Sequence, residues 1–120
     1  MNVETFREYC LAKKGVTEEF PFDEKTLVFK VMGKIFVLTD IDAVDFSINL
    51  KCEPEKAILL REQYEAVQPG YHMSKKHWNT VYAQRDASDK LIKEWIDNSY
   101  RLVVAGLPKK LQKELENFNK

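Results

Sequence analysis

The sequence has only two cysteines, four glycines and four prolines in 120 residues, and it has no excess of either charge, because 19 basic residues balance 19 acidic ones. Cys10 and Cys52 match no CxxC or Cys/His metal motif, and we interpret them as buried thiols rather than as a disulfide. Balanced charge provides no general attraction to nucleic acid or to anionic membranes. Binding of that kind therefore requires a local basic surface.

The chain also has no apolar run near the roughly 18 residues that a membrane-spanning helix requires. Its first ten residues, MNVETFREYC, mix acids with bases and lack the apolar segment of a signal peptide. We therefore expect a cytoplasmic protein without a membrane segment. The length suits one hydrophobic core, and no linker or repeat divides the chain, so we expect a single domain over residues 1–120.

Alternation of apolar and polar residues predicts three strands in the first half of the chain. Thr26–Met32 and Ile35–Thr39 are expected to pair antiparallel through a two-residue turn at Gly33-Lys34, and residues 46–51 are expected to add the third strand. Before the hairpin, the segment Phe20–Phe22 is expected to seal the edge of the core.

A further strand is predicted around Trp78, because residues 78–82 also alternate. Tyr71–Met73 is a candidate short strand before it. The alternatives for this region are a second hairpin, or an irregular loop followed by one strand.

Four helices are indicated by apolar residues at helical spacing and by their capping residues. Asn2 is expected to cap the first helix, Pro54 to begin the second, Ser88 to cap a long third helix that ends at Gly106, and Pro108 to begin the last. This order of elements predicts an α+β fold, a two-layer sandwich with helices packed on one face of an antiparallel sheet.

The densest polar and aromatic cluster is YHMSKKHWN, at residues 71–79. Lysines there can contact phosphates, and the rings can stack on bases. A second segment without acids runs along the predicted hairpin. The candidate nucleic-acid-binding residues are Lys30, Lys34, Tyr71, His72, Lys75, Lys76, His77 and Trp78. The structural alternative is that Trp78 lies in the core and that the lysines form an ordinary solvated rim.

No motif for catalysis, metal or cofactor binding is present. The separation of His72 and His77 fits neither one face of a helix nor one face of a strand, and Ser74 between them lies in no nucleophile signature. The acidic segment 40–45 lacks the glycine and distal glutamate of a calcium loop, and no GxGxxG or Walker sequence occurs. We therefore expect no catalytic residues, no metal and no cofactor.

Four segments together resemble the MmcQ/YjbR family: PFDEKTLVFKVMGKIFVL (21–38), INLKCEPEKAILLREQY (48–64), VQPGYHMSKKHWNTV (67–81) and SYRLVVAGL (99–107). The resemblance spans nearly the whole chain. It implies a two-layer fold similar to frataxin-like and secretion-chaperone-like architectures. Family members are described as DNA-binding proteins with a double-wing motif, and the wings would correspond to the hairpin around Gly33-Lys34 and to the segment Lys75–Trp78.

Three functions from different classes follow. The first is a non-enzymatic DNA-binding module that uses the basic and aromatic residues. The second is a protein-interaction or chaperone-like adaptor with an exposed docking surface. The third is a small-molecule or catalytic site around Tyr71, His72 and His77.

Overall fold

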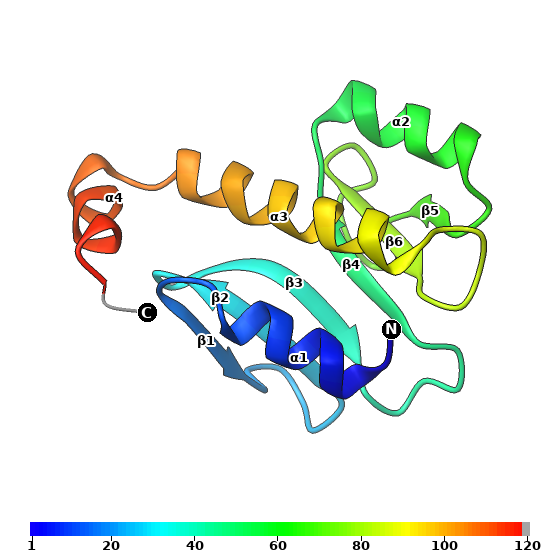
Figure 1. The fold of residues 1–120 in the computed structure, drawn as a ribbon, viewed down its shortest axis with the longest axis horizontal. Coiled ribbons are helices and arrows are strands. Elements are labelled where there is room, and N and C mark those ends of the chain that lie inside the picture. The colour runs from blue at the N-terminus through cyan, green and yellow to red at the C-terminus, as the bar shows by residue number, and fades with distance from the viewer. Residues whose placement is uncertain (119–120) are drawn as a thin grey trace.

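The structure is a computed structural model that describes residues 1–118 (Figure 1). Its elements alternate along the chain as α1, β1–β4, α2, β5–β6, α3 and α4. The helices are α1 (Val3–Leu11), α2 (Pro54–Gln63), α3 (Asp89–Ala105) and α4 (Lys109–Glu116). The strands are β1 (Val16–Glu19), β2 (Thr26–Val31), β3 (Lys34–Asp40), β4 (Ser47–Lys51), β5 (Val67–Pro69) and β6 (Trp78–Tyr82).

The strands form one antiparallel sheet in the order β1-β2-β3-β4-β6-β5. One face is covered by α1 and α3, whose apolar residues pack with Phe29, Val37 and Ile48 in the core. The opposite face carries no helix among the described residues, and we call it the helix-free face. The predicted α+β fold with helices on one face is confirmed.

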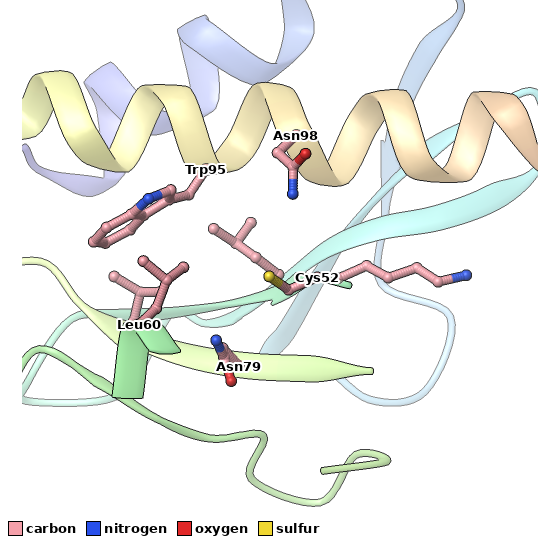
Figure 2. A pocket seen from close by; sticks show the side chains of 8 residues that line it. Cys52, Leu60, Asn79, Trp95 and Asn98 are labelled. Carbon is pink, nitrogen blue, oxygen red and sulfur yellow. The ribbon is translucent and has the colours of Figure 1, made fainter. Parts of the chain in front are cut away.

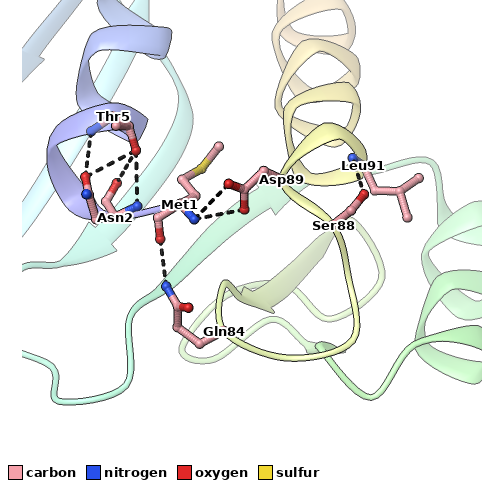
Figure 3. A network of polar contacts seen from close by, with 7 residues as sticks. All are labelled: Met1, Asn2, Thr5, Gln84, Ser88, Asp89 and Leu91. Carbon is pink, nitrogen blue, oxygen red and sulfur yellow. Dashed lines mark hydrogen bonds and ion pairs between the residues drawn. The ribbon is translucent and has the colours of Figure 1, made fainter.

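The predicted helix starts are confirmed to within one residue, since Pro108 directly precedes α4, and the segment before α1 is bonded to the first residue of α3 (Figure 3). The Asn2 carboxamide accepts a hydrogen bond from the Thr5 backbone N–H at 2.9 Å, and the Thr5 hydroxyl accepts one from the Asn2 N–H at 3.1 Å. Ser88 caps α3. The Met1 ammonium lies 2.8 Å from the Asp89 carboxylate, so the chain start is attached to the start of α3.

The β2–β3 turn lies one residue earlier than predicted. Val31 pairs with Lys34, so the central turn residues are Met32 and Gly33, both with positive φ, +50° and +84°. Two positive φ values describe a type I′ turn, whose twist matches that of the strands it joins. Gly33 adopts this conformation without steric cost, whereas Met32 adopts it because the pairing on either side requires it.

The candidate strand at Tyr71–Met73 is wrong. His72 has a φ of +58°, which no strand accommodates, and the Tyr71 N–H donates to the side chain of Thr80 rather than to a backbone carbonyl of a neighbouring strand. The strand that pairs with β6 is β5, a few residues earlier, which ends at Pro69. Proline is tolerated in β5 because this strand lies at the edge of the sheet. Of the two alternatives, the hairpin is confirmed, with a long loop between its strands.

Sequence patterns also missed β1, the opposite edge strand. Its sequence, VTEE, contains one apolar residue, Val16, and shows no clear alternation. It is held by pairing with β2 and by Glu18, which accepts hydrogen bonds from Arg7 of α1. The predicted buried thiols are confirmed, because Cys10 and Cys52 are both free and buried.

Candidate nucleic-acid interface

Residues 70–77, which we call loop 70–77, join β5 to β6 and are held by contacts from α2. The Arg61 guanidinium donates through Nε to the side-chain oxygen of Asn79 at 2.7 Å, and through Nη2 to the backbone carbonyl of Lys75. At the start of the loop, a Cβ on Gly70 would lie 2.9 Å from Trp78 Cβ, so only glycine fits there. The loop is therefore fixed at both ends rather than free.

A polar chain ties the loop to the sheet on the helix-free face. The Tyr71 N–H donates to the Thr80 hydroxyl at 3.0 Å, and that hydroxyl donates to the Asn49 side-chain oxygen at 2.6 Å. The Tyr71 ring packs on the His72 ring, with centroids 4.0 Å apart. Thr80 and Asn49 are directly opposed in β6 and β4, so the register of the sheet sets the position of Tyr71.

Loop 70–77 borders a groove of about 410 Å³ on the helix-free face, which we call the sheet groove. Its floor comes from β3 and β4, and its sides come from loop 70–77 and from the segment before β2. The lining residues are Phe22, Thr26, Ile35, Leu38, Thr39, Asp40, Asn49, Tyr71, His72 and Met73. This volume is in the range of about 300–1,000 Å³ of small-ligand sites.

The predicted interface residues lie in two separate places. Lys30 and Lys34 belong to the β2–β3 hairpin, whose tip lies towards α4, whereas the others belong to loop 70–77 or to the start of β6, near α2 (Figure 1). Lys30 is ion-paired with Glu19. Lys34 is opposed to Val31, so side-chain alternation directs Lys30 and Lys34 to opposite faces of the sheet. The two basic segments therefore do not merge into one cationic surface.

Within loop 70–77, the predicted residues differ in exposure. Tyr71 is 68% exposed, and Lys76 and His77 are also exposed. The Lys75 ammonium donates to the Gly70 carbonyl at 2.9 Å and keeps its charge at the surface. Trp78 is half-buried, and its register directs it to the helix-free face rather than into the core beneath α3.

Lys51 was missed by the sequence analysis. It is opposed to Trp78 in the neighbouring strand, so both side chains leave the helix-free face at the same end of the sheet. We call Lys51, Lys75 and Lys76 the basic end. None of the three has an ion-pair partner among residues 1–118. Alternation within the predicted strand 46–51 indicates that Lys51 shares a face of the sheet with Asn49. That Trp78 is the neighbour of Lys51 follows only from the strand order, which places β6 beside β4.

The prediction that Phe20 and Phe22 seal the core edge is wrong, because they are 47% and 66% exposed. The core beneath α1 is closed instead by residues of α1 itself. Among them is Phe6, whose ring packs edge-on against that of Phe29, with the ring centroids 5.3 Å apart. Phe22 is thereby left at the surface, where it lines the sheet groove.

A second cavity lies inside the protein, between α2, α3 and the sheet, and it measures only about 10 Å³ (Figure 2). Leu60 and Trp95 face each other across it, and Cys52, Asn79 and Asn98 also line it. Such a space holds about one water molecule, and burial raises the pKa of the Cys52 thiol, which disfavours the reactive thiolate. This cavity is a packing feature and not a ligand site.

Residues 1–118 contain no cluster of three or more histidine, cysteine or acidic side chains placed to hold a metal ion. No helix within that range combines the length and apolarity required to cross a membrane.

The fold and the site together define a class: small α+β domains with a six-stranded antiparallel sheet, helices on one face and a loop-bordered groove on the other. The YjbR family model matches residues 11–102, and the chain belongs to the YjbR family.

Relatives match over most of their length. YbdF of Escherichia coli O157:H7 is 42% identical over 93% of this chain and 92% of its own. YjbR of Escherichia coli K12 is 34% identical over 96% of this chain and 98% of its own. A crystal structure of a Deinococcus radiodurans protein is 38% identical, has a TM-score of 0.89, and covers 96% of this chain and 88% of its own. These names state no activity, so function must be argued from the geometry.

Proposed function

We propose that this protein is a non-enzymatic DNA-binding module that holds a single strand on its helix-free face, with loop 70–77 and the basic end as the main contacts. The observation that carries the proposal is the pairing of β4 with β6. This pairing sets Lys51 beside Trp78, at the base of the loop that contains Tyr71, Lys75 and Lys76. Aromatic rings and unpaired cations then occur together on an open sheet face.

Stacking on exposed rings supplies the first part of the binding energy. Tyr71 is more than two-thirds exposed although it is a large aromatic residue, and its backbone is fixed by Thr80. The ring itself packs on His72, and a ring that is partly ordered before binding loses less conformational entropy when a base stacks on it. Each stacked base contributes about 1–3 kcal/mol in proteins that bind single strands. Single strands suit this surface better than duplexes, since their bases are free to stack.

Contacts with phosphates supply the second part. The basic end places three cations near the rings, while the whole chain has no net charge. With about three phosphates neutralised, a rise in salt from 50 to 200 mM is expected to weaken binding by about 20-fold. Lys30 and Lys34 lie outside this contact: Lys30 is ion-paired with Glu19, and Lys34 is directed to the other face.

Fluorescence anisotropy with a labelled thymidine strand at low salt tests this proposal. The double variant Lys75→Glu with Lys76→Glu is expected to lose most of the binding. The matched control is Lys109→Glu with Lys110→Glu, which makes the same charge change on exposed lysines of α4, on the other side of the molecule (Figure 1). Equal loss in both variants, or no binding by the unmodified protein, would contradict the proposal.

A second candidate, a protein-interaction role, is favoured by one observation on α2. Ile58 and Leu59 are adjacent and each is 54% exposed, which leaves an apolar patch on a helix. If α2 docks on a second copy of this chain, light scattering will show a dimer that Leu59→Lys abolishes. A monomer at all concentrations would contradict self-association through α2.

A further inference from the structure

The sheet groove has two exposed aromatic residues from segments that are remote in sequence. Its floor lies over β3 and β4, which supply Leu38 and Asn49 as directly opposed residues. Strand β2 lies on one side of this floor and β6 on the other. Phe22 precedes β2, and Tyr71 is bonded through its N–H to Thr80 of β6, so the two residues border the groove from opposite sides.

Exposed rings on two sides of a groove suit a flat aromatic ligand. Phe22 and Tyr71 are 66% and 68% exposed, so neither ring contributes much to the core. The side chains of Ile35, Leu38 and Met73 make the rest of the lining largely apolar. A planar ring between such walls gains stacking and burial, as bases do in proteins that bind single strands.

The polar groups of the groove select which edge of the ring is recognised. Asp40 follows Leu38 by two residues in β3, so it is the diagonal neighbour of Asn49 on the same face. One Asp40 oxygen accepts the Asp42 N–H at 2.9 Å, and no described cation pairs with this carboxylate. The Asn49 oxygen is occupied by Thr80, which leaves its NH₂ group as a donor.

This arrangement of acceptors beside a donor matches one base. A carboxylate offers only acceptors and binds two adjacent N–H groups best. Guanine presents the adjacent donors N1–H and N2–H with the acceptor O6 next to them, whereas adenine and cytosine have a ring-nitrogen acceptor beside their amino group and thymine has a single N–H. We propose that the sheet groove binds a guanine base, with Asp40 accepting from N1–H and N2–H and Asn49 donating to O6. This inference rests on the proposed binding of single-stranded DNA.

Four labelled strands that differ only at the central nucleotide test the inference: a nine-nucleotide thymidine strand, and the same strand with guanine, hypoxanthine or adenine at its centre. Hypoxanthine is guanine without the 2-amino group, so it removes one of the two donors to Asp40. Anisotropy titrations are expected to show about tenfold tighter binding of the guanine strand than of the other three.

Variants separate this inference from the proposed function. Asp40→Asn is expected to remove the preference for guanine over hypoxanthine without weakening binding to the all-thymidine strand, because loss of a negative charge does not repel phosphates. Asp42→Asn, which changes a neighbouring acid outside the groove lining, is expected to keep the preference. Equal affinity of the unmodified protein for the guanine and hypoxanthine strands, with the all-thymidine strand bound, overturns the guanine site alone. Absence of binding to all four strands overturns the proposed function and this inference with it.

Discussion

On the face of the sheet that α1 and α3 cover, Phe29 and Val37 are fully buried, whereas on the helix-free face Phe22 and Tyr71 stay two-thirds exposed. The covered face is closed by contacts between apolar side chains, among them the edge-on pair of Phe6 and Phe29. The helix-free face also buries Val28 and Leu38, but the segment that carries Tyr71 is held there by a polar chain from Tyr71 through Thr80 to Asn49.

The difference indicates where stability and function lie. Burial of apolar area drives folding, so substitutions on the covered face act mainly on the free energy of unfolding. Exposed rings on the other face contribute little to that free energy, and they are available for a ligand. Four experiments sharpen or break this contrast.

The largest effect is expected for Phe29→Ala. The Phe29 side chain is fully buried and packs on Phe6, so its loss leaves a cavity and costs about 3–5 kcal/mol of the free energy of unfolding. Urea denaturation followed by circular dichroism measures this value. A cost below about 1 kcal/mol would show that the covered face is not the main source of stability.

Arg61→Ala is expected to cost about 1.5–3 kcal/mol, because the variant loses hydrogen bonds of a charged donor and leaves the buried Asn79 oxygen without its partner. Loop 70–77 is also expected to exchange its amide hydrogens faster. Arg101→Ala, at an exposed position on α3, serves as the matched control. Unchanged exchange in loop 70–77 would show that Arg61 does not hold it.

Acid is expected to destabilise the fold through carboxylates that accept hydrogen bonds. The Ala66 N–H lowers the pKa of Asp86, the Thr26 N–H lowers the pKa of Asp23, and the Asn98 amide lowers the pKa of Glu53.

A pKa that is lower in the folded state gives stability that is complete above the unfolded value, about 4, and that is lost as pH falls through the folded value. Urea midpoints are therefore expected to be constant from pH 7 to 5 and to fall below pH 4. Asp86→Asn is expected to flatten this fall, and an unchanged slope in that variant would contradict the role of Asp86.

Tyr71→Ala is expected to have the smallest effect on stability, within about 0.5 kcal/mol, because the ring is exposed and only the backbone N–H of Tyr71 is used by Thr80. The same variant is expected to weaken binding of the thymidine strand by about tenfold, since one stacked base is lost. A stability loss above about 2 kcal/mol would place Tyr71 with the structural residues instead.

Much of the fold was predictable from the sequence because its signals are local. Asn2 and Ser88 cap their helices through bonds made within a few residues, and alternation marked the strands of the first hairpin. Predictions were wrong where pairing overrode local preference. Met32 adopts a positive φ because Val31 pairs with Lys34, and β1 exists because β2 lies beside it.

The candidate site was predictable in part. The segment 71–79 was identified from its composition, but two contributors came from elsewhere in the chain. Lys51 joins the basic end only because β6 inserts between β4 and β5, and Phe22 joins the sheet groove only because β2 lies beside β3, which supplies part of the groove floor. Neither fact is encoded within a few residues of the side chain concerned.

The order of charges, rings and apolar positions along the chain, and hence the four helices, the strands of the first hairpin and the segments that carry cations, was determined by the sequence alone. Which of these segments meet was decided by the tertiary structure. Strand pairing separated Lys30 from Lys34 across the sheet and joined Lys51 to Trp78, since opposed residues of neighbouring strands share a face and successive residues of one strand alternate between faces.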